Sequence, residues 1–221
     1  MSFHSFYNIW MEQLRQLQLQ LRQAEEDQQQ QRHLVQKSLS HYDEYYRIKS
    51  SSAMNDVLSF FPAPWASSLE RSLHWIGGWR PTTAFHLIYT ESSILFQSHV
   101  VDILRGRSTG DLGDLSPGQL RRVSELQCET VQQENDITDE LSEWQDGANY
   151  LAGMYDELDQ KIERLAGILI RADALRLKTI KNLVELLTPK QAAEFFVAAA
   201  DLQFGIRAWG SAKDRRSCVR Q

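Results

Sequence analysis

The side chains that most often carry catalysis or bind metals are sparse in this sequence of 221 residues. Its histidines stand at positions 4, 33, 41, 74, 86 and 99, and no two of them have the spacing that places two metal ligands on one helical face. His74 and His86 flank a turn and could meet, yet a buried or interface role fits each better than a catalytic one. Cys128 and Cys218 form no Cys-x-x-Cys pair, which favours a reducing compartment.

Two further segments lack the features of a chemical site. The run GRSTGDLGD, from Gly106 to Asp114, has the glycines of a phosphate loop, but it follows no strand pattern and lacks the Gly-Lys-Ser/Thr ending. Twelve acidic residues lie between Glu125 and Glu163, but they are spread along a polar helical face. Raising a carboxyl pKa for acid-base chemistry would require an apolar pocket. The sequence therefore predicts no enzyme, no metal site and no cofactor.

Charge and hydropathy exclude other classes. A formal net charge of −5 argues against a protein built to neutralise the phosphates of nucleic acid. No window approaches eighteen uninterrupted apolar residues, and the start MSFHSFYNIW lacks the basic and apolar regions of a signal peptide. We therefore expect no membrane span.

The elements that must position these residues are predicted to be helices. Apolar residues recur every three to four positions through most of the chain, which is the period of a helix with one buried face. The five prolines, at 62, 64, 81, 117 and 189, each fall where such a pattern starts or stops. We therefore predict an all-α fold, a single domain of about six to eight mostly long antiparallel helices.

The stretch from Leu69 to Tyr89 is predicted to form a sharp corner. A helix capped by Ser68 should run into Gly77-Gly78 and close there, because glycine tolerates left-handed backbone angles. Pro81 should begin the next helix, since its fixed φ is already helical. Aromatic side chains gather about this corner at Trp75, Trp79, Phe85 and Tyr89.

Other segments depart from a plain helical pattern. Only Lys49 interrupts the second apolar stripe. The helix that begins at Ser116-Pro117 has polar residues in the middle of its stripe, which predicts partial exposure. The glycine-containing run 105–115 should be flexible. After the last helix, which begins at Thr188-Pro189, residues 210–221 should form a basic, disordered tail.

Several spaced motifs resemble, in order, the plant Delay of Germination (DOG) domain. They are FxxFYxxW at the start, HYDEYYRIKS (41–50), the Asn55-Asp56-Val57 step, LERSLHWIGGWRP (69–81), ADALRLKT (172–179) and WGSAKDRR (209–216). The likeness assigns residues 3–209 to one DOG domain. Such domains form the seed-dormancy proteins of that name and the C-terminal half of plant TGA-type bZIP transcription factors. This chain looks like a stand-alone DOG-like protein, with no basic region or zipper, so direct DNA binding is not expected.

The resemblance implies a non-enzymatic regulator that binds proteins in seed dormancy, abscisic acid signalling and regulation of transcription. In the dormancy proteins an N-terminal helix contacts clade A type 2C protein phosphatases, and the corresponding positions are Phe6, Tyr7, Trp10 and Met11. Those proteins also bind haem through two histidines on the last helix. This chain has Gln203 and Arg207 there, and neither supplies the imidazole that haem iron usually takes. Haem binding is therefore not expected.

The relation to TGA-type factors leaves alternatives open. Their DOG domains hold a fatty acyl chain and dock a co-activator, which implies either a co-regulator that pairs with TGA-type factors or a sensor of a lipid or small apolar ligand. The groove for such a ligand would be lined by Trp75, Trp79, Phe85 and Tyr89. A third alternative is a factor in pollen-aperture development, the task of one family branch. The implied location is the nucleus, the cytoplasm or both, and the partner and oligomeric state stay open.

Overall fold

A computed structural model describes residues 2–24, 27–147 and 158–218. Its elements are α1 (Phe3–Gln23), α2 (Gln28–Asn55), α3 (Val57–Phe60), α4 (Ser68–Leu73), α5 (Thr83–Leu104), the 3₁₀ helix η1 (Leu112–Asp114), α6 (Pro117–Asp146), α7 (Leu158–Leu186) and α8 (Pro189–Cys218). The described residues contain no strand, so the predicted all-α fold is confirmed. None of these helices is long and apolar enough to cross a membrane.

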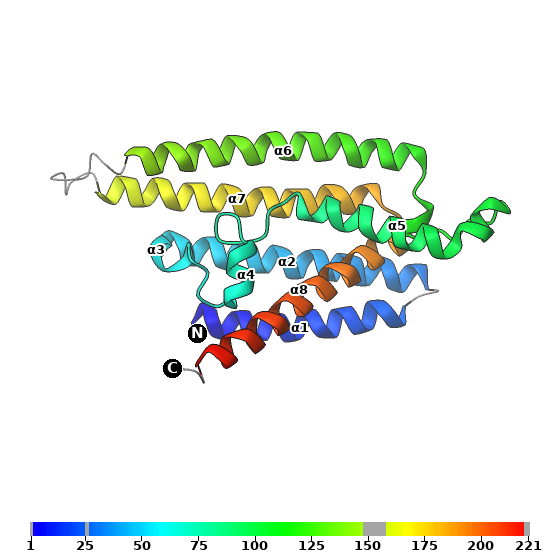
Figure 1. Ribbon diagram of the computed structural model, residues 1–221, viewed down its shortest axis with the longest axis horizontal. Helices are drawn as coiled ribbons and strands as arrows, with labels where there is room; N and C mark the ends of the chain where they lie inside the picture. The colour runs from blue at the N-terminus through cyan, green and yellow to red at the C-terminus, as the bar shows by residue number, and fades with distance from the viewer. Residues whose placement is uncertain (1, 25–26, 148–157, 219–221) are drawn as a thin grey trace.

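Four long helices lie side by side in the order α6, α7, α2 and α1, and each runs antiparallel to its neighbour (Figure 1). The last helix, α8, crosses this row obliquely and contacts α1, α2, α4 and α5. Because α8 touches elements from both ends of the sequence, it closes the fold. The N-terminus of α1 and the C-terminus of α8 lie at the same end of the molecule (Figure 1).

Local sequence explains where the long helices begin. The carboxylate of Asp27 accepts hydrogen bonds from the backbone of Gln29 and Gln30, so α2 begins as a separate helix capped by Asp27. Ser116 and Gln119 form a reciprocal capping box at the start of α6, with Pro117 in the first turn. Pro117 and Pro189 therefore stand at the first residues of α6 and α8, as predicted, whereas Pro81 lies in a turn and the next helix, α5, begins at Thr83.

Three hydrophobic clusters make up the core. One joins α1, α2, α5, α7 and α8, and includes the fully buried Phe85, Ile88 and Leu183. A second packs α7 against α2, α3 and α6 around Ile168 and Leu169. The third joins the start of α1 to the segment before α4 and to α8. Core side chains thus come from every long helix.

The prediction of a disordered tail after residue 209 is wrong for residues 210–218, which continue α8. A Cβ at Gly210 would lie 2.7 Å from the Cβ of Ser67, so the absence of a side chain lets α8 approach α4 closely. The carboxylate of Asp214 accepts a hydrogen bond from the backbone N–H of Ser68 at 3.0 Å. These contacts fasten the basic end of α8 to the start of α4.

Packing adds detail to two other expectations. Within the run 105–115, Leu112 is fully buried and Asp111 nearly so, and the run includes η1. The helix α6 is partly exposed, as predicted, but its polar Thr130 and Glu134 do not face solvent, with 1% and 2% exposure. Glu134 accepts hydrogen bonds from the backbone N–H and the hydroxyl of Thr82, so its carboxylate joins α6 to the start of α5.

Candidate functional site

The corner after α4 is a two-residue turn rather than a helix end. The helix α4 stops at Leu73, and Trp75 and Gly78 pair through two backbone hydrogen bonds of 2.7 and 3.3 Å. Ile76 and Gly77 both have left-handed φ angles, 48° and 67°, as the tight hairpin turn with two positive φ values requires. The predicted helix through Trp75 is therefore wrong, whereas the left-handed glycine is confirmed at Gly77.

Two buried cations hold this turn. The Lys49 ammonium donates to the carbonyl of Gly77 at 2.8 Å, and Arg176 donates to the carbonyls of Trp75, Ile76 and Trp79. A bulky residue at Gly78 would meet the guanidinium of Arg176, since a Cβ there lies 3.0 Å from its Cζ. The turn therefore depends on side chains from α2 and α7 to satisfy its backbone.

Asp173 of α7 balances the two cations. Its Oδ1 accepts hydrogen bonds from Lys49 at 2.9 Å and from Arg176 at 2.5 Å, and its side chain is fully buried. Among described residues, its Oδ2 accepts no hydrogen bond. Burial lowers the pKa of Lys49 to about 8, and the neighbouring carboxylate opposes part of that shift. The excess positive charge faces backbone carbonyls inside the protein.

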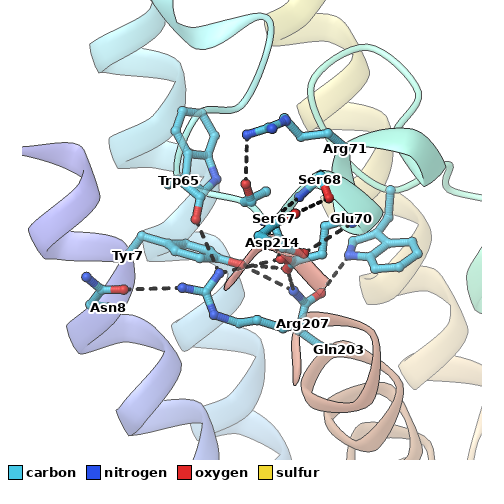
Figure 2. Close-up of polar contacts among 12 residues, drawn as sticks. Tyr7, Asn8, Trp65, Ser67, Ser68, Glu70, Arg71, Gln203, Arg207 and Asp214 are labelled. Atoms are coloured by element: carbon cyan, nitrogen blue, oxygen red, sulfur yellow. Dashed lines mark hydrogen bonds and ion pairs between the residues drawn. The ribbon is translucent and has the colours of Figure 1, made fainter. Parts of the chain in front are cut away.

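A second polar network joins α1, α4 and α8 (Figure 2). At its centre lies Glu70, fully buried, whose carboxylate accepts hydrogen bonds from the Gln203 amide at 2.9 Å and the Ser67 backbone at 2.7 Å. The Tyr7 hydroxyl lies 3.5 Å from the same carboxylate. The Arg207 guanidinium is 3.6 Å away and also lies over the Tyr7 ring. The pKa of Tyr7 is raised, chiefly by burial and then by Glu70.

Gln203 and Arg207 are therefore held by the fold. Gln203 donates to Glu70 and to the Tyr7 hydroxyl, and its carbonyl accepts from the Trp79 indole at 2.6 Å. Arg207 donates to the carbonyl of Trp65 at 3.2 Å (Figure 2). These two positions, where the sequence resemblance places haem ligands, stabilise the junction of α8 with α4 instead.

The four corner aromatics do not line one groove. Phe85 is fully buried in the core, and Trp75 is also buried, with its indole donating to Thr138 at 3.0 Å. Tyr89 packs at the edge of the first cluster and donates to Gln127 at 3.0 Å. Trp79 lines a cavity among α2, α5, α7 and α8 whose lining does not include the other three.

That cavity, of about 100 Å³, lies among α2, α5, α7 and α8. Its walls are mainly apolar and aromatic, with Arg80, Arg176 and Gln203 as polar members. Arg176 belongs to the network under the turn and Gln203 to the network around Glu70. The cavity is thus bordered by both networks, which the sequence alone did not indicate.

The predicted partner-binding residues of α1 are buried within the fold. Phe6, Tyr7, Trp10 and Met11 are exposed by only 3 to 8% of their surfaces. Trp10 stacks on His41, with 4.7 Å between ring centroids, and its indole donates to the His41 carbonyl. These four side chains attach α1 to the rest of the protein.

The remaining sequence candidates do not assemble a reactive centre. His74 packs edge-on against Trp79, while His86 is exposed. Burial lowers the pKa of His41 and of His74 to about 4, so both imidazoles are neutral at pH 7. In the ranges that the structure describes, no group of three or more His, Cys, Asp or Glu side chains could hold a metal ion.

Comparison with known proteins identifies the relatives of this chain. Residues 11–90 match a family described as DOG1, seed dormancy control. Protein DOG1-like 3 of Arabidopsis thaliana is 28% identical over 211 residues, covering 85% of this chain and 75% of the relative. Protein DOG1-like 1 of the same plant is 28% identical over 250 residues, covering 95% and 89%.

Transcription factors of the TGA type match as well. The bZIP transcription factor TGA10 of Nicotiana tabacum is 30% identical over 213 residues, which is 95% of this chain and 41% of the factor. The similarity thus extends over most of this chain but less than half of the transcription factor. The relationship to TGA-type factors that the sequence motifs indicated is confirmed.

Proposed function

Because this chain belongs to the Delay of Germination family, we propose that it is a non-enzymatic regulatory protein that acts by binding other proteins in seed dormancy control. The family match carries this proposal. The arrangement of charges supports it, because Glu70 and Asp173 are fully buried and their partners are other groups of the fold. A catalytic acid or base must instead reach its substrate.

We propose that the partner docks on α1 and is a clade A type 2C protein phosphatase, which would place the protein in abscisic acid signalling. Phe6, Tyr7, Trp10 and Met11 would then act by holding α1 in place, since their side chains are buried. Direct contact would fall to the outer face of the same helix. On that face Ile9 is 50% exposed, so it is available for an apolar contact with a partner.

A second candidate function is supported by the match to TGA10, which extends over 95% of this chain. In this alternative the protein is a nuclear co-regulator that joins TGA-type factors at DNA through their DOG domains. It would reach DNA only through its partner.

Affinity capture from seed extract tests both candidates, with an Ile9→Glu variant and a matched Leu58→Glu control. Leu58 lies on α3 and is 55% exposed, so the two substitutions are equivalent in burial. We expect the wild type and Leu58→Glu to enrich a type 2C phosphatase and Ile9→Glu to lose it. Enrichment of TGA-type factors instead would favour the co-regulator. Equal phosphatase capture by all three proteins would exclude docking on α1.

A further inference from the structure

The cavity among α2, α5, α7 and α8 has the walls of a site for a flat ring. Trp79, Phe195 and Phe196 line it together with Tyr42 and Tyr46. Tyr42 also stacks against Phe196, with 5.8 Å between ring centroids and 22° between planes. Aromatic faces arranged in this way favour stacked or edge-on contact with another ring.

The two tyrosine hydroxyls are left available for a ligand. No described residue forms a hydrogen bond with the hydroxyl of Tyr42 or of Tyr46, whereas the Tyr7 and Tyr89 hydroxyls have partners. Burial raises the pKa of both Tyr42 and Tyr46, so each remains a neutral donor. Both tyrosines are only partly buried, and neither hydroxyl is fully shielded from solvent, so each can exchange water for an atom of a ligand.

The charged members of the lining are of one sign. Arg80 and Arg176 line the cavity, and no described Asp or Glu does. Arg176 is fixed by Asp173 and by backbone carbonyls. Arg80 has 48% of its side chain exposed and lies 3.9 Å from Glu134, so its guanidinium can turn toward the opening. The lining therefore favours an anionic group over a cationic one.

The volume limits the size of the occupant. An engineered apolar cavity of about 150 Å³ holds benzene, and this cavity of about 100 Å³ is somewhat smaller. A single ring would fill it, with its polar substituent at the rim near Arg80.

We propose that this cavity binds a small aromatic carboxylic acid. The ring lies against Trp79, Phe195 and Phe196, and the carboxylate accepts hydrogen bonds from Arg80 and a tyrosine hydroxyl. Such a ligand would touch Trp79 and Gln203, which connect through Glu70 to α1. Its binding would therefore stabilise the junction of α1, α4 and α8.

The test is a calorimetric titration of the full chain with benzoate, toluene and benzylamine, which present the same ring with negative, neutral and positive character. We expect saturable binding of benzoate, weaker binding of toluene and none of benzylamine. Arg80→Gln should lower the affinity for benzoate at least about tenfold, because it removes a charge-assisted hydrogen bond. It should leave the affinity for toluene unchanged. Arg121→Gln, which removes an exposed arginine of α6, is the matched control and should bind like the wild type.

Two further variants separate the cavity from the surface. Ala199→Leu should abolish binding because the larger side chain fills the space. Tyr46→Phe should lower the affinity for benzoate several-fold. Tyr89→Phe should leave it unchanged, because the Tyr89 hydroxyl already donates a hydrogen bond to Gln127. The proposal is overturned by an absence of saturable benzoate binding, by equal affinity for benzylamine, or by benzoate affinity unchanged in Arg80→Gln and Ala199→Leu.

Discussion

Lys49 of α2 and Asp173 of α7 are 2.9 Å apart between Nζ and Oδ1, with at most 1% of either side chain exposed. The residues are 124 positions apart in the chain. Their contact joins α2 to α7 in the middle of the helical row and places the ammonium beneath the carbonyl of Gly77. A pair so deeply buried stabilises only while each charge keeps its partners.

Removing the acid should be more damaging than removing the lysine. Asp173→Ala leaves Lys49 and Arg176 buried without an opposing charge, and we expect a loss of about 3–5 kcal/mol in the free energy of unfolding. Lys49→Met leaves the Asp173–Arg176 pair intact and should lose about half as much. Urea unfolding of the three proteins measures both differences. Equal losses in the two variants would contradict this role for Asp173.

Replacing each of two glycines of α8 with alanine should change the stability of the protein in opposite directions, because only one of them contacts α4. At Gly210 a Cβ would lie 2.7 Å from that of Ser67 and 3.0 Å from that of Leu69, so Gly210→Ala should lower stability by about 1–3 kcal/mol. At Gly205, on the same helix, a Cβ would meet nothing within 4 Å. Gly205→Ala should raise stability by about 0.5–1 kcal/mol, since alanine favours helix. Thermal unfolding of both variants checks the signs.

Haem should not bind at Gln203 and Arg207. Both side chains are engaged with Glu70, and neither offers an imidazole. Titration of haem into the protein should therefore give the spectrum of free haem, followed in the Soret region. A sharp Soret band that shifts on protein addition, and that disappears in Gln203→Ala, would show that this assignment is wrong.

The helical framework was predictable because its signals are local. Apolar periodicity and the capping sequences at Ser116 and Thr188 depend on residues within one or two turns of each other, and the helices begin there as expected. The end of α8 was not predictable in this way. Its basic composition is typical of a frayed terminus. This end is held by contacts of Gly210 with Ser67 and of Asp214 with Ser68, and the second pair is 146 residues apart in the chain.

The buried charges show the same limit. In the sequence, Lys49 is visible as an interruption of an apolar stripe, and that was the only signal of the network beneath the turn. Asp173 gives no local signal, because a carboxylate looks the same in a sequence whether it faces solvent or a buried cation. Glu70 has only the local signal of the capping box that it forms with Ser67, which does not indicate its contact with α8. The cavity is also non-local, since its walls come from four helices. Only the fold places Tyr42 and Tyr46 beside Trp79.

Buried histidines predict how stability depends on pH. The Nε2 of His41 lies 3.0 Å from the carbonyl of Trp10, and burial lowers its pKa to about 4 from an unfolded value of 6.5. His74 is shifted to the same value by burial. Since the folded pKa is below the unfolded one, the contribution is fully present above pH 6.5 and is lost as the pH falls toward 4. The contribution of each histidine to the free energy of unfolding should therefore fall by about 2–3 kcal/mol between pH 6.5 and pH 4.

Glu194 changes the pH dependence of stability in the opposite direction, so its effect must be distinguished from that of the histidines. Burial raises its pKa to about 7, so its contribution is present below pH 4.5 and is lost as the pH rises through 7. We therefore compare variants by their change in unfolding free energy between pH 7 and pH 4.5, rather than by stability at one pH. From pH 7 to pH 4.5, His41→Gln should lose about 2 kcal/mol less unfolding free energy than the wild type. The control His86→Gln, at an exposed site, should lose as much as the wild type. If His41→Gln keeps the wild-type pH dependence, the imidazole is not held neutral by its burial against Trp10.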